Sequence, residues 1–568
     1  MEIPGRIFPH KVTGNQTNSV GVAPSPFPPL LDRFRWQAAA LALLVLVAYA
    51  NSLGSSFHFD DAAIFTDPRI LRPGFGWDIF RLEQTRPLTN LTFHWNYLVG
   101  GQDPVLYHWV NLLLHAANSI LLLAVARRYL SPFTAGCVAV LFALHPLQTE
   151  SVTYVFARST LLSTHLALWV LWFHARGKYL SSALLFGLSL LAKEETIALP
   201  GFLLLLELFA RRRPNIGYFA ALAGFAGLAA GRLFYAIHVS PIVPGVGRVR
   251  GISAGGYLLT ESRVLWIYLR LAIAPFGLNL DRDVRLSTGL LEPWTTLAGI
   301  LALALLIAAL AWLAWKKQSA AALWALGFFV LISPSSSIVA QTDAIFEHRT
   351  YLPLVPMAIA LGFLLQRIPR RWLAIGVAAL IPVMLAGTIS RNADWHDERT
   401  LWTDIARKSP NKGRSWLGMA STYWNDPAKA REYLSRGLAV DPGNALLHTN
   451  YGIVSLSLGQ PAEALDHFQR AMALTGETAD SWNNIGAAYF RLNDLGASLD
   501  GFEHALRLDS CNFNARRNLM MLYSSRNQPQ AAWQAGEVPA ACTMLPDQVR
   551  ELRALQSLVA GPRQPMQH

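Results

Sequence analysis

Long apolar runs separated by short polar segments follow one another from Trp36 to Ile389. The runs are roughly 16 to 24 residues long, about the length that a helix needs to cross a bilayer. A further helical segment at 257–275 carries Glu261 and two arginines, so we expect it to lie in the membrane interface. About eleven crossings result, with eleven to thirteen allowed. We expect them near 36–53, 106–126, 132–147, 157–175, 179–193, 197–210, 216–238, 294–315, 319–338, 351–366 and 372–389.

The pattern changes near Asn411, where a period of 34 residues begins. Leucine or tyrosine or isoleucine followed by glycine recurs at 417–418, 451–452 and 485–486, and large side chains recur at 434, 468 and 502. This spacing is typical of tetratricopeptide repeats, which are pairs of interlocking helices. The periodicity predicts about three to four repeats with a capping helix near 545–559.

These patterns divide the chain into three parts. We expect residues 1–33, which are polar and proline-rich, to form a disordered cytoplasmic tail. Residues 34–390 would form the transmembrane domain, with a first external loop at 54–105. Residues 391–568 would form the repeat domain.

Composition supports the membrane assignment, because 52% of the residues are hydrophobic and only 15% are charged. The net charge of +12 comes largely from short basic clusters between apolar runs, which is typical of cytoplasmic loops. No basic patch is interleaved with stacking aromatic residues, so we do not expect nucleic acid as a partner. With these clusters inside, the loops 54–105, 145–156 and 339–350 and the repeat domain fall on the external side. The clusters are Arg127-Arg128, Arg176 with Lys178, Arg211–Arg213, Lys316-Lys317 and Arg367 with Arg370-Arg371.

The chain has three cysteines. Cys137 lies in an apolar run, where a buried thiol is the simplest interpretation. Cys511 and Cys542 both lie in the repeat domain. An oxidising compartment would permit a bond between them, but the sequence leaves open whether they are close enough.

Two adjacent carboxylates, Asp60 and Asp61, follow the first apolar run directly. A carboxylate at the membrane surface could act as a general base that takes a proton from an acceptor hydroxyl. The alternative is a solvated loop acid or a helix cap. The sequence alone does not decide between these roles.

Further polar residues cluster at the external ends of the apolar runs. His108, Asn111, His115 and Asn118 lie in one run. For Asn111, His115 and Asn118, hydrogen bonding between helices is the simpler interpretation. The other polar groups come from four loops, and a set of acids and cations there would suit transfer from an anionic lipid phosphate. An ion-pair network that holds the loops together is the alternative. These residues are Arg86, His145, Glu150, Arg158, Lys193, His348 and Arg349.

Taken in order, these motifs resemble the transmembrane and tetratricopeptide-repeat glycosyltransferases, relatives of the protein O-mannosyltransferases. The resemblance spans about residues 36 to 560 and implies an all-α polytopic membrane fold of the GT-C type with a carboxyl-terminal α-solenoid. It also implies roles for individual residues. The motifs are His58-Phe59-Asp60-Asp61, Arg86-Pro87-Leu88, His108 with Asn111 and His115, His145–Glu150, Ala157-Arg158-Ser159, Leu191–Glu194 and Glu347–Pro353.

By this resemblance Asp60 or Asp61, with Asp60 favoured, is the catalytic acid of the first loop, and Glu150 is the acid of the second. Arg86 would contact the phosphate of the donor, and Arg158, Lys193 and Arg349 are weaker candidates for the same contact. The histidines and Asn111 would be supporting polar groups. The chain departs from the pattern in its short repeat array and in Glu194-Glu195, which could pair with Lys193.

The implied function is transfer of a monosaccharide from a polyprenyl-phosphate donor to a hydroxyl of a secreted or surface protein held by the repeats. We expect a bacterial inner-membrane enzyme whose active face is in the periplasm. It requires no cofactor and no metal, although the paired carboxylates leave a divalent cation possible. Two alternatives stay open: an oligosaccharyltransferase or polymerase with a polyprenyl-pyrophosphate donor, and a non-enzymatic membrane-anchored scaffold.

Overall fold

The structure is a computed structural model that describes residues 32–71, 74, 76–80, 85–238, 253–336, 343–542, 544 and 546–559. Within these ranges every regular element is a helix. The chain divides into two compact units, Met1–Leu401 and Trp402–His568. The predicted tail lies outside the described residues except for its last two positions.

The first unit contains helices at all the predicted spans. Five of them are long and apolar enough to cross a membrane, or six if the bent pair 132–143 and 146–153 is one span. This length and composition are those of a polytopic membrane protein, while the total of eleven crossings stays a prediction. The five are α1 (Phe34–Tyr49), α4 (Pro104–Ala126), α10 (Ile216–His238), α12 (Thr295–Lys317) and α15 (Arg370–Asp394). The others are α5 (Pro132–Ala143), α7 (Arg158–His174), α8 (Tyr179–Ala192), α9 (Leu199–Phe209), α13 (Ala320–Ile332) and α14 (Leu354–Leu365).

Local sequence signals explain where several of these helices begin. Asp103 precedes Pro104 at the start of α4 and accepts a hydrogen bond from the backbone N–H of Val105. Ser131 caps α5 in the same way, again with proline in the first turn. Proline is suited to this position because the first turn has no partner for the N–H that it lacks.

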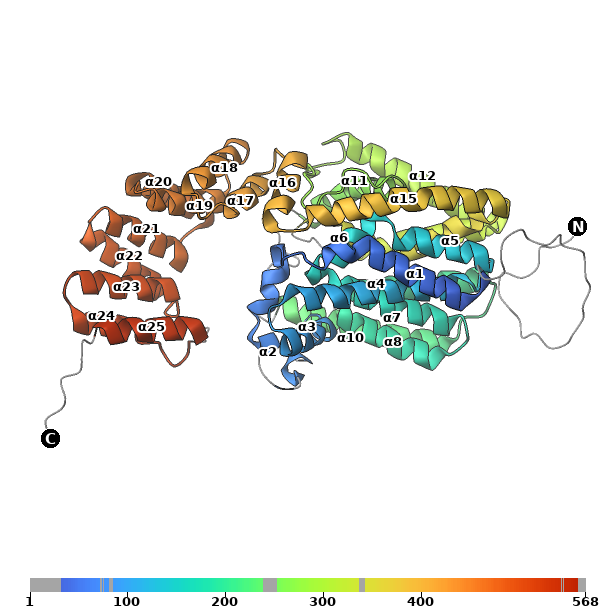
Figure 1. The fold of residues 1–568 in the computed structure, drawn as a ribbon, viewed down its shortest axis with the longest axis horizontal. Coiled ribbons are helices and arrows are strands. Elements are labelled where there is room, and N and C mark those ends of the chain that lie inside the picture. Colours follow the sequence, from blue (N-terminus) through green and yellow to red (C-terminus); the bar gives the residue numbers. More distant parts are fainter. Residues whose placement is uncertain are drawn as a thin grey trace, which may run out of the picture. The chain divides into compact units, whose positions relative to one another are not determined.

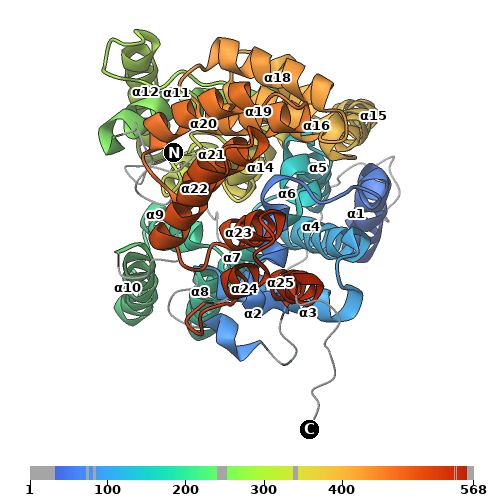
Figure 2. The same cartoon turned by 90° about the vertical axis from the view of Figure 1, so that its left-hand side faces the viewer.

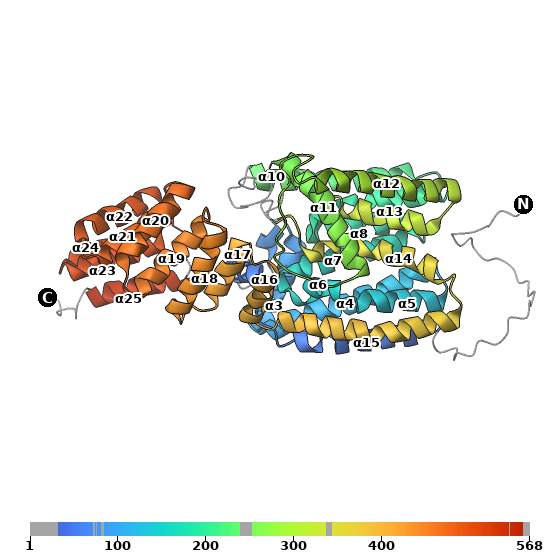
Figure 3. The ribbon, with the colours of Figure 1, turned by 90° about the horizontal axis from the view of Figure 1, so that it is seen from above.

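α4 is the central helix of this unit. It lies beside α1, α5 and α7, with α8 on the far side of α7 (Figure 1). In its most apolar window 61% of the residues are buried, against 11% for α10 and 17% for α12. An apolar helix that stays exposed in this way needs lipid around it. Figure 3 shows α12 and α15 along the outside of the bundle.

Short elements connect these helices on the side that carries the polar motifs. The first connection contains α2 (Pro68–Leu71) and α3 (Pro87–Gly100), and the second contains α6 (Thr149–Thr153). Tight 3-10 turns occur at Phe59–Phe65, Trp77–Phe80, Pro146–Gln148, Val155–Ala157, Glu194–Ala198 and Glu347–Thr350. The segment expected in the interface forms α11 (Ala254–Ile273), which packs on α12.

The second unit consists of antiparallel helix pairs that follow one another, as Figure 2 shows for α19 to α22. Its glycines explain the period of 34, because a Cβ on Gly452 would lie 2.5 Å from the Phe468 ring and one on Gly486 would lie 2.8 Å from Phe502. The aromatic ring of one helix therefore needs a glycine on its partner, as expected for these repeats. α16 (Glu398–Lys408) includes the boundary between the two units. The helices after it are α17 (Gly413–Ser421), α18 (Pro427–Val440), α19 (Ala445–Ser457), α20 (Pro461–Thr475), α21 (Ala479–Arg491), α22 (Leu495–Leu508), α23 (Phe513–Ser525), α24 (Pro529–Ala535) and α25 (Pro546–Val559).

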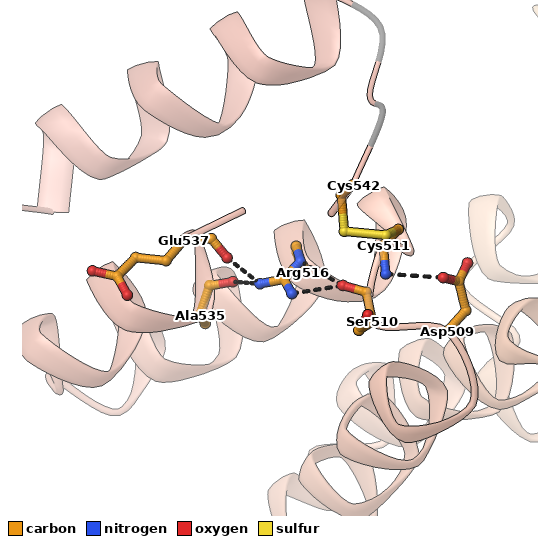
Figure 4. Close-up of a disulfide and its surroundings, with 7 residues drawn as sticks. All are labelled: Asp509, Ser510, Cys511, Arg516, Ala535, Glu537 and Cys542. Atoms are coloured by element: carbon orange, nitrogen blue, oxygen red, sulfur yellow. Dashed lines mark hydrogen bonds between the residues drawn. A yellow bond between two sulfur atoms is a disulfide. The ribbon is translucent and has the colours of Figure 1, made fainter. Parts of the chain in front are cut away.

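The disulfide that the sequence left open is formed. Cys511 and Cys542 are bonded, with their Cα atoms 5.4 Å apart (Figure 4). Beside the bond, the guanidinium of Arg516 donates hydrogen bonds to the backbone carbonyls of Ser510, Ala535 and Glu537. Both contacts join the start of α23 to the segment that follows α24. The remaining cysteine, Cys137, is a buried thiol, as expected.

Candidate functional site

The two aspartates after the first helix have different surroundings. Asp61 is fully buried, and its two carboxylate oxygens accept hydrogen bonds from the backbone N–H groups of His58 (2.9 Å) and Phe156 (2.7 Å). Asp60 is exposed, and its backbone N–H donates to the hydroxyl of Tyr154 at 3.2 Å. Asp61 thus joins the loop that follows α1 to the loop that contains Tyr154, while Asp60 is exposed and also interacts with the side chain of Tyr154.

The backbone before Asp60 is strained. Phe59 has a φ of 52°, in the left-handed region that a bulky side chain rarely occupies. Such conformations persist only where the surrounding structure imposes them, and they are enriched at functional sites. Here the capping hydrogen bonds of Asp61 hold the turn from one side. The turn that carries Asp60 is therefore held in place by its surroundings.

Burial changes the pKa values of Asp61 and of its neighbour Tyr154. It raises the pKa of Asp61 to about 8, and the neighbouring Asp60 adds to the shift. Burial also raises the pKa of Tyr154, and both aspartates act in the same direction. Tyr154 therefore keeps its proton next to Asp60, and its hydroxyl is a hydrogen-bond donor at neutral pH.

Arg158, a predicted phosphate contact, is fully buried at the first position of α7. Its guanidinium donates to Asn111 (2.9 Å), to Asn96 and to the carbonyl of Tyr107 (3.1 Å). It also lies 4.5 Å from the centre of the Phe93 ring. These contacts tie α3, α4 and α7 together next to Asp61, so the surroundings of Arg158 are those of a brace between helices.

Arg86 precedes α3 and Lys193 follows α8, and each is paired with a carboxylate. Arg86 makes a bidentate ion pair with Glu194, with distances of 2.6 and 3.1 Å, and its side chain is 29% exposed. Lys193 is almost fully buried and contacts Glu195 at 2.8 Å and the hydroxyl of Thr160 at 2.9 Å. Arg86 is therefore the more accessible cation of the two.

Glu150 is buried and bound to the turn that begins at Glu347. Its carboxylate is 2.6 Å from Nδ1 of His348 and accepts from the backbone N–H groups of Glu347 and His348, both at 3.3 Å. Glu347 is buried as well, accepts from the N–H of Asn279 at 2.7 Å, and has its pKa raised by burial to about 7. Glu150 thus joins its own loop to the turn at Glu347–Thr350 instead of facing solvent.

The four remaining polar candidates are hydrogen-bonded inside the protein. His108 contacts the carbonyl of Ser55 at 3.0 Å, and Asn111 donates to the carbonyl of Val152 at 3.2 Å. Both ring nitrogens of His115 are occupied, one by the hydroxyl of Tyr351 at 2.7 Å and one by the carbonyl of Ala143 at 3.0 Å. His145 contacts the carbonyl of Ala272 at 3.1 Å and accepts from the N–H of Leu147. For Asn111 and His115 these contacts are of the kind that the sequence favoured, and for His108 and His145 the sequence predicted no particular partner.

Arg349 is almost fully buried beside α11. Its guanidinium donates to the carbonyl of Asp343 (2.8 Å) and to the hydroxyl of Tyr257 (3.4 Å). Glu261 on α11 is 1% exposed and interacts electrostatically with Arg349. The sequence drew attention to Glu261 only as a charge on an amphipathic helix, and nothing in its spacing indicated this neighbour.

Tyr154 is the functional candidate that the sequence did not identify. Besides its contact with Asp60, its ring is 6.4 Å from His348 and 5.6 Å from Trp395, measured between ring centres. It therefore lies between Asp60 and the pair formed by Glu150 and His348. Within the described ranges, no three His, Cys, Asp or Glu side chains are grouped so as to hold a metal ion.

Comparison with known proteins finds a repeat family within the chain and relatives that cover up to 73% of it. The family model for the tetratricopeptide repeat matches residues 443–510. The protein O-mannosyl-transferase TMTC3 of Mus musculus is 24% identical over 483 residues, which cover 73% of this chain and 52% of that protein. The corresponding Homo sapiens protein is 29% identical over 205 residues, covering 32% of this chain and 22% of that protein.

A shorter match is closer in sequence. The protein O-mannosyl-transferase Tmtc1 of Drosophila melanogaster is 36% identical over 142 residues, which cover 22% of this chain and 16% of that protein. This chain spans about half the length of the curated relative that it matches over 483 residues. The comparisons confirm the resemblance that the motifs indicated: the chain is related in sequence to the transmembrane and tetratricopeptide-repeat protein O-mannosyl-transferases.

Proposed function

We propose that this protein is a membrane glycosyltransferase of the GT-C type that moves one sugar from a polyprenyl-phosphate donor to a hydroxyl of a protein. The observation that carries the proposal is the contrast between Asp60 and Asp61. One carboxylate is exposed on a strained turn, and the other is buried and fixes that turn. The relatives are named protein O-mannosyl-transferases, which supports glycosyl transfer to protein and makes mannose the first sugar to test.

Asp60 would be the general base of this reaction. The acceptor oxygen attacks the anomeric carbon of the sugar, its proton passes to Asp60, and the bond from the sugar to the phosphate oxygen breaks. The polyprenyl phosphate leaves with the bonding electrons. The hydroxyl of Tyr154, already hydrogen-bonded to the backbone of Asp60, would orient the base.

Arg86 is our candidate for the cation that stabilises the leaving phosphate. Its guanidinium is partly exposed, and a forked donor suits two phosphate oxygens as well as it suits Glu194. Lys193, which is buried next to Arg86, would add positive charge near the phosphate without contacting it directly. Arg158 and Arg349 would act by positioning, because their hydrogen bonds go to protein groups. Glu150 would act with His348 in holding the loop around the acceptor.

The donor phosphate is a good leaving group, so the base and the cations would suffice without a metal, and a divalent cation is not required. The repeat domain would hold the acceptor protein, since repeats of this kind present a concave surface. We propose that the protein lies in a bacterial inner membrane, with its active face and its repeats on the periplasmic side. The disulfide between Cys511 and Cys542 supports an oxidising compartment for the repeats.

The proposal is tested by measuring the intact masses of secreted and surface proteins from cells with and without the gene. Loss of a hexose-sized mass from a defined protein is the expected result. Re-expression of the wild type should restore it, D60N should not, and D67N should serve as the matched control, because Asp67 lies in the same loop but pairs with Arg69. Undiminished glycosylation in D60N, D61N and E150Q would contradict the enzymatic function and leave the scaffold as the alternative.

A further inference from the structure

A groove lies on the membrane unit between α1, α4 and α7, which Figure 1 shows side by side. Its volume is about 660 Å³, and its walls are formed mostly by apolar side chains such as Ile120, Leu121 and Trp169. The polar atoms of its one histidine, His165, are occupied by Asn118 and by the indole N–H of Trp169. The wall therefore offers an apolar surface along its length.

Three guanidinium groups gather at one end of this groove. Arg127 lies over the ring of Phe34 at 5.6 Å, while Arg128 and Arg176 lie over Trp172 at 5.5 and 4.1 Å. Arg127 also donates to Oε1 of Gln37 at 2.9 Å, and Arg128 donates to the carbonyl of Ala175 at 3.1 Å. The aromatic faces and these uncharged acceptors hold the cations in place without neutralising them. None of the three makes an ion pair with a carboxylate in the part of the chain that the structure describes.

The preceding segment of the chain carries more basic than acidic side chains. Residues 1–31 contain Glu2 as their only carboxylate side chain, together with the basic residues Arg6 and Lys11. Asp32 already pairs with Arg370 at 3.0 Å. An apolar groove that ends in a row of uncompensated cations fits an amphiphile with an anionic head.

The groove is separate from the candidate site. Arg127 follows Asn111 by sixteen residues on the helix α4 and its C-cap, a distance of about 24 Å along the axis. The catalytic candidates lie at the other end of that helix. A donor lipid with its phosphate at Arg127 would place the sugar far from Asp60.

We infer that this groove binds an anionic phospholipid of the surrounding membrane. The head group would contact Arg127, Arg128 and Arg176, and an acyl chain would lie along Ala117 and Ala124. The basic clusters predict that this is the cytoplasmic leaflet, in which anionic lipids attract basic pockets between helices. The inference does not depend on the proposed enzymatic activity.

The test uses the full-length protein purified in detergent, with phosphatidylglycerol and phosphatidylcholine as probes in native mass spectrometry. Wild type should retain phosphatidylglycerol in preference to phosphatidylcholine. R127Q/R128Q should weaken phosphatidylglycerol binding by about 25-fold, roughly five-fold for each cation. K316Q/K317Q is the matched control, because it removes two predicted cytoplasmic cations at the end of α12, away from the groove, and should leave binding unchanged.

A second variant protects the test from misfolding. A124F narrows the groove and keeps every cation, so it should weaken retention of both lipids while the melting temperature without lipid stays near that of wild type. Equal binding of the two lipids by wild type, or equal losses in R127Q/R128Q and K316Q/K317Q, would overturn the inference. Displacement of phosphatidylglycerol from the groove by a polyprenyl phosphate, abolished in A124F, would also overturn it and identify a donor-lipid groove.

Discussion

The Oδ1 atom of Asp61 accepts a 2.7 Å hydrogen bond from the backbone N–H of Phe156, although the two residues are 95 positions apart. The other oxygen accepts from the N–H of His58. Each of these two N–H groups needs a side-chain oxygen as its acceptor, and asparagine has only one such oxygen. D61N should therefore leave one buried N–H unpaired, which costs about 1–3 kcal/mol, and lower the melting temperature.

D60N should behave differently. The side chain of Asp60 is exposed, so the melting temperature should stay near that of wild type. Loss of a general base should lower the transfer rate by about 10²–10⁴-fold. Thermal melting and transfer assays on D60N and D61N check these expectations. A D60N enzyme with normal turnover would exclude Asp60 as the base.

The stability of the protein should depend on pH through Asp61. Burial raises its folded pKa to about 8, above the value in an unfolded chain. The contribution of Asp61 to the unfolding free energy is therefore complete below about pH 4 and is lost as pH rises through about 8. Melting temperatures measured from pH 5 to pH 9 should fall more steeply in wild type than in D61N. Parallel curves would show that Asp61 does not carry this dependence.

Glu150 and His348 should act as one unit. Their side chains are 2.6 Å apart, and Glu150 also accepts from the backbone of the same turn. E150Q and H348Q should each reduce transfer, and the double variant should be little worse than the poorer single variant. A coupling energy of about 0.5–3 kcal/mol in a double-mutant cycle is expected. Additive losses would mean that the two residues act separately.

The ion pair between Arg86 and Glu194 offers a test of phosphate binding. R86K loses the forked geometry and should raise the KM for the lipid donor about ten-fold. E194Q keeps the guanidinium but removes the competing carboxylate, so it should lower this KM. Kinetics at varied donor concentration distinguish the two. A rise in KM in both variants would indicate that the pair is only structural.

The disulfide should stabilise the end of the repeat domain. Cys511 and Cys542 are separated by 31 positions, a loop for which chain entropy alone predicts about 3–4 kcal/mol. C511S/C542S should lower the melting temperature of the full chain, and a reducing agent should produce the same shift in wild type only. The variant C137S is the control, because Cys137 forms no disulfide and its loss should not abolish the response to reductant.

Local patterns predicted much of the fold. Apolar runs placed the helices of the membrane unit, because each run is complete within about twenty residues. The repeats were equally visible, since the glycine at 452 and the phenylalanine at 468 return one repeat later at 486 and 502. The order of the polar motifs was enough to indicate the family.

The roles of individual site residues required the tertiary structure. Asp60 and Asp61 are adjacent acids in the sequence, and it is the packing of the loop around Phe156 that makes one buried and leaves the other exposed. Tyr154 and Glu261 gained their importance in the same way, from neighbours far along the chain.

The sequence by itself determined which segments are helical, where the repeats begin and which polar groups the loops carry. It left open which carboxylate is accessible, which cation is already paired and whether Cys511 and Cys542 meet. The tertiary structure decided these because burial and hydrogen bonding arise from segments that pack together after being separated by 30 to more than 100 positions, such as the two cysteines or Arg86 and Glu194.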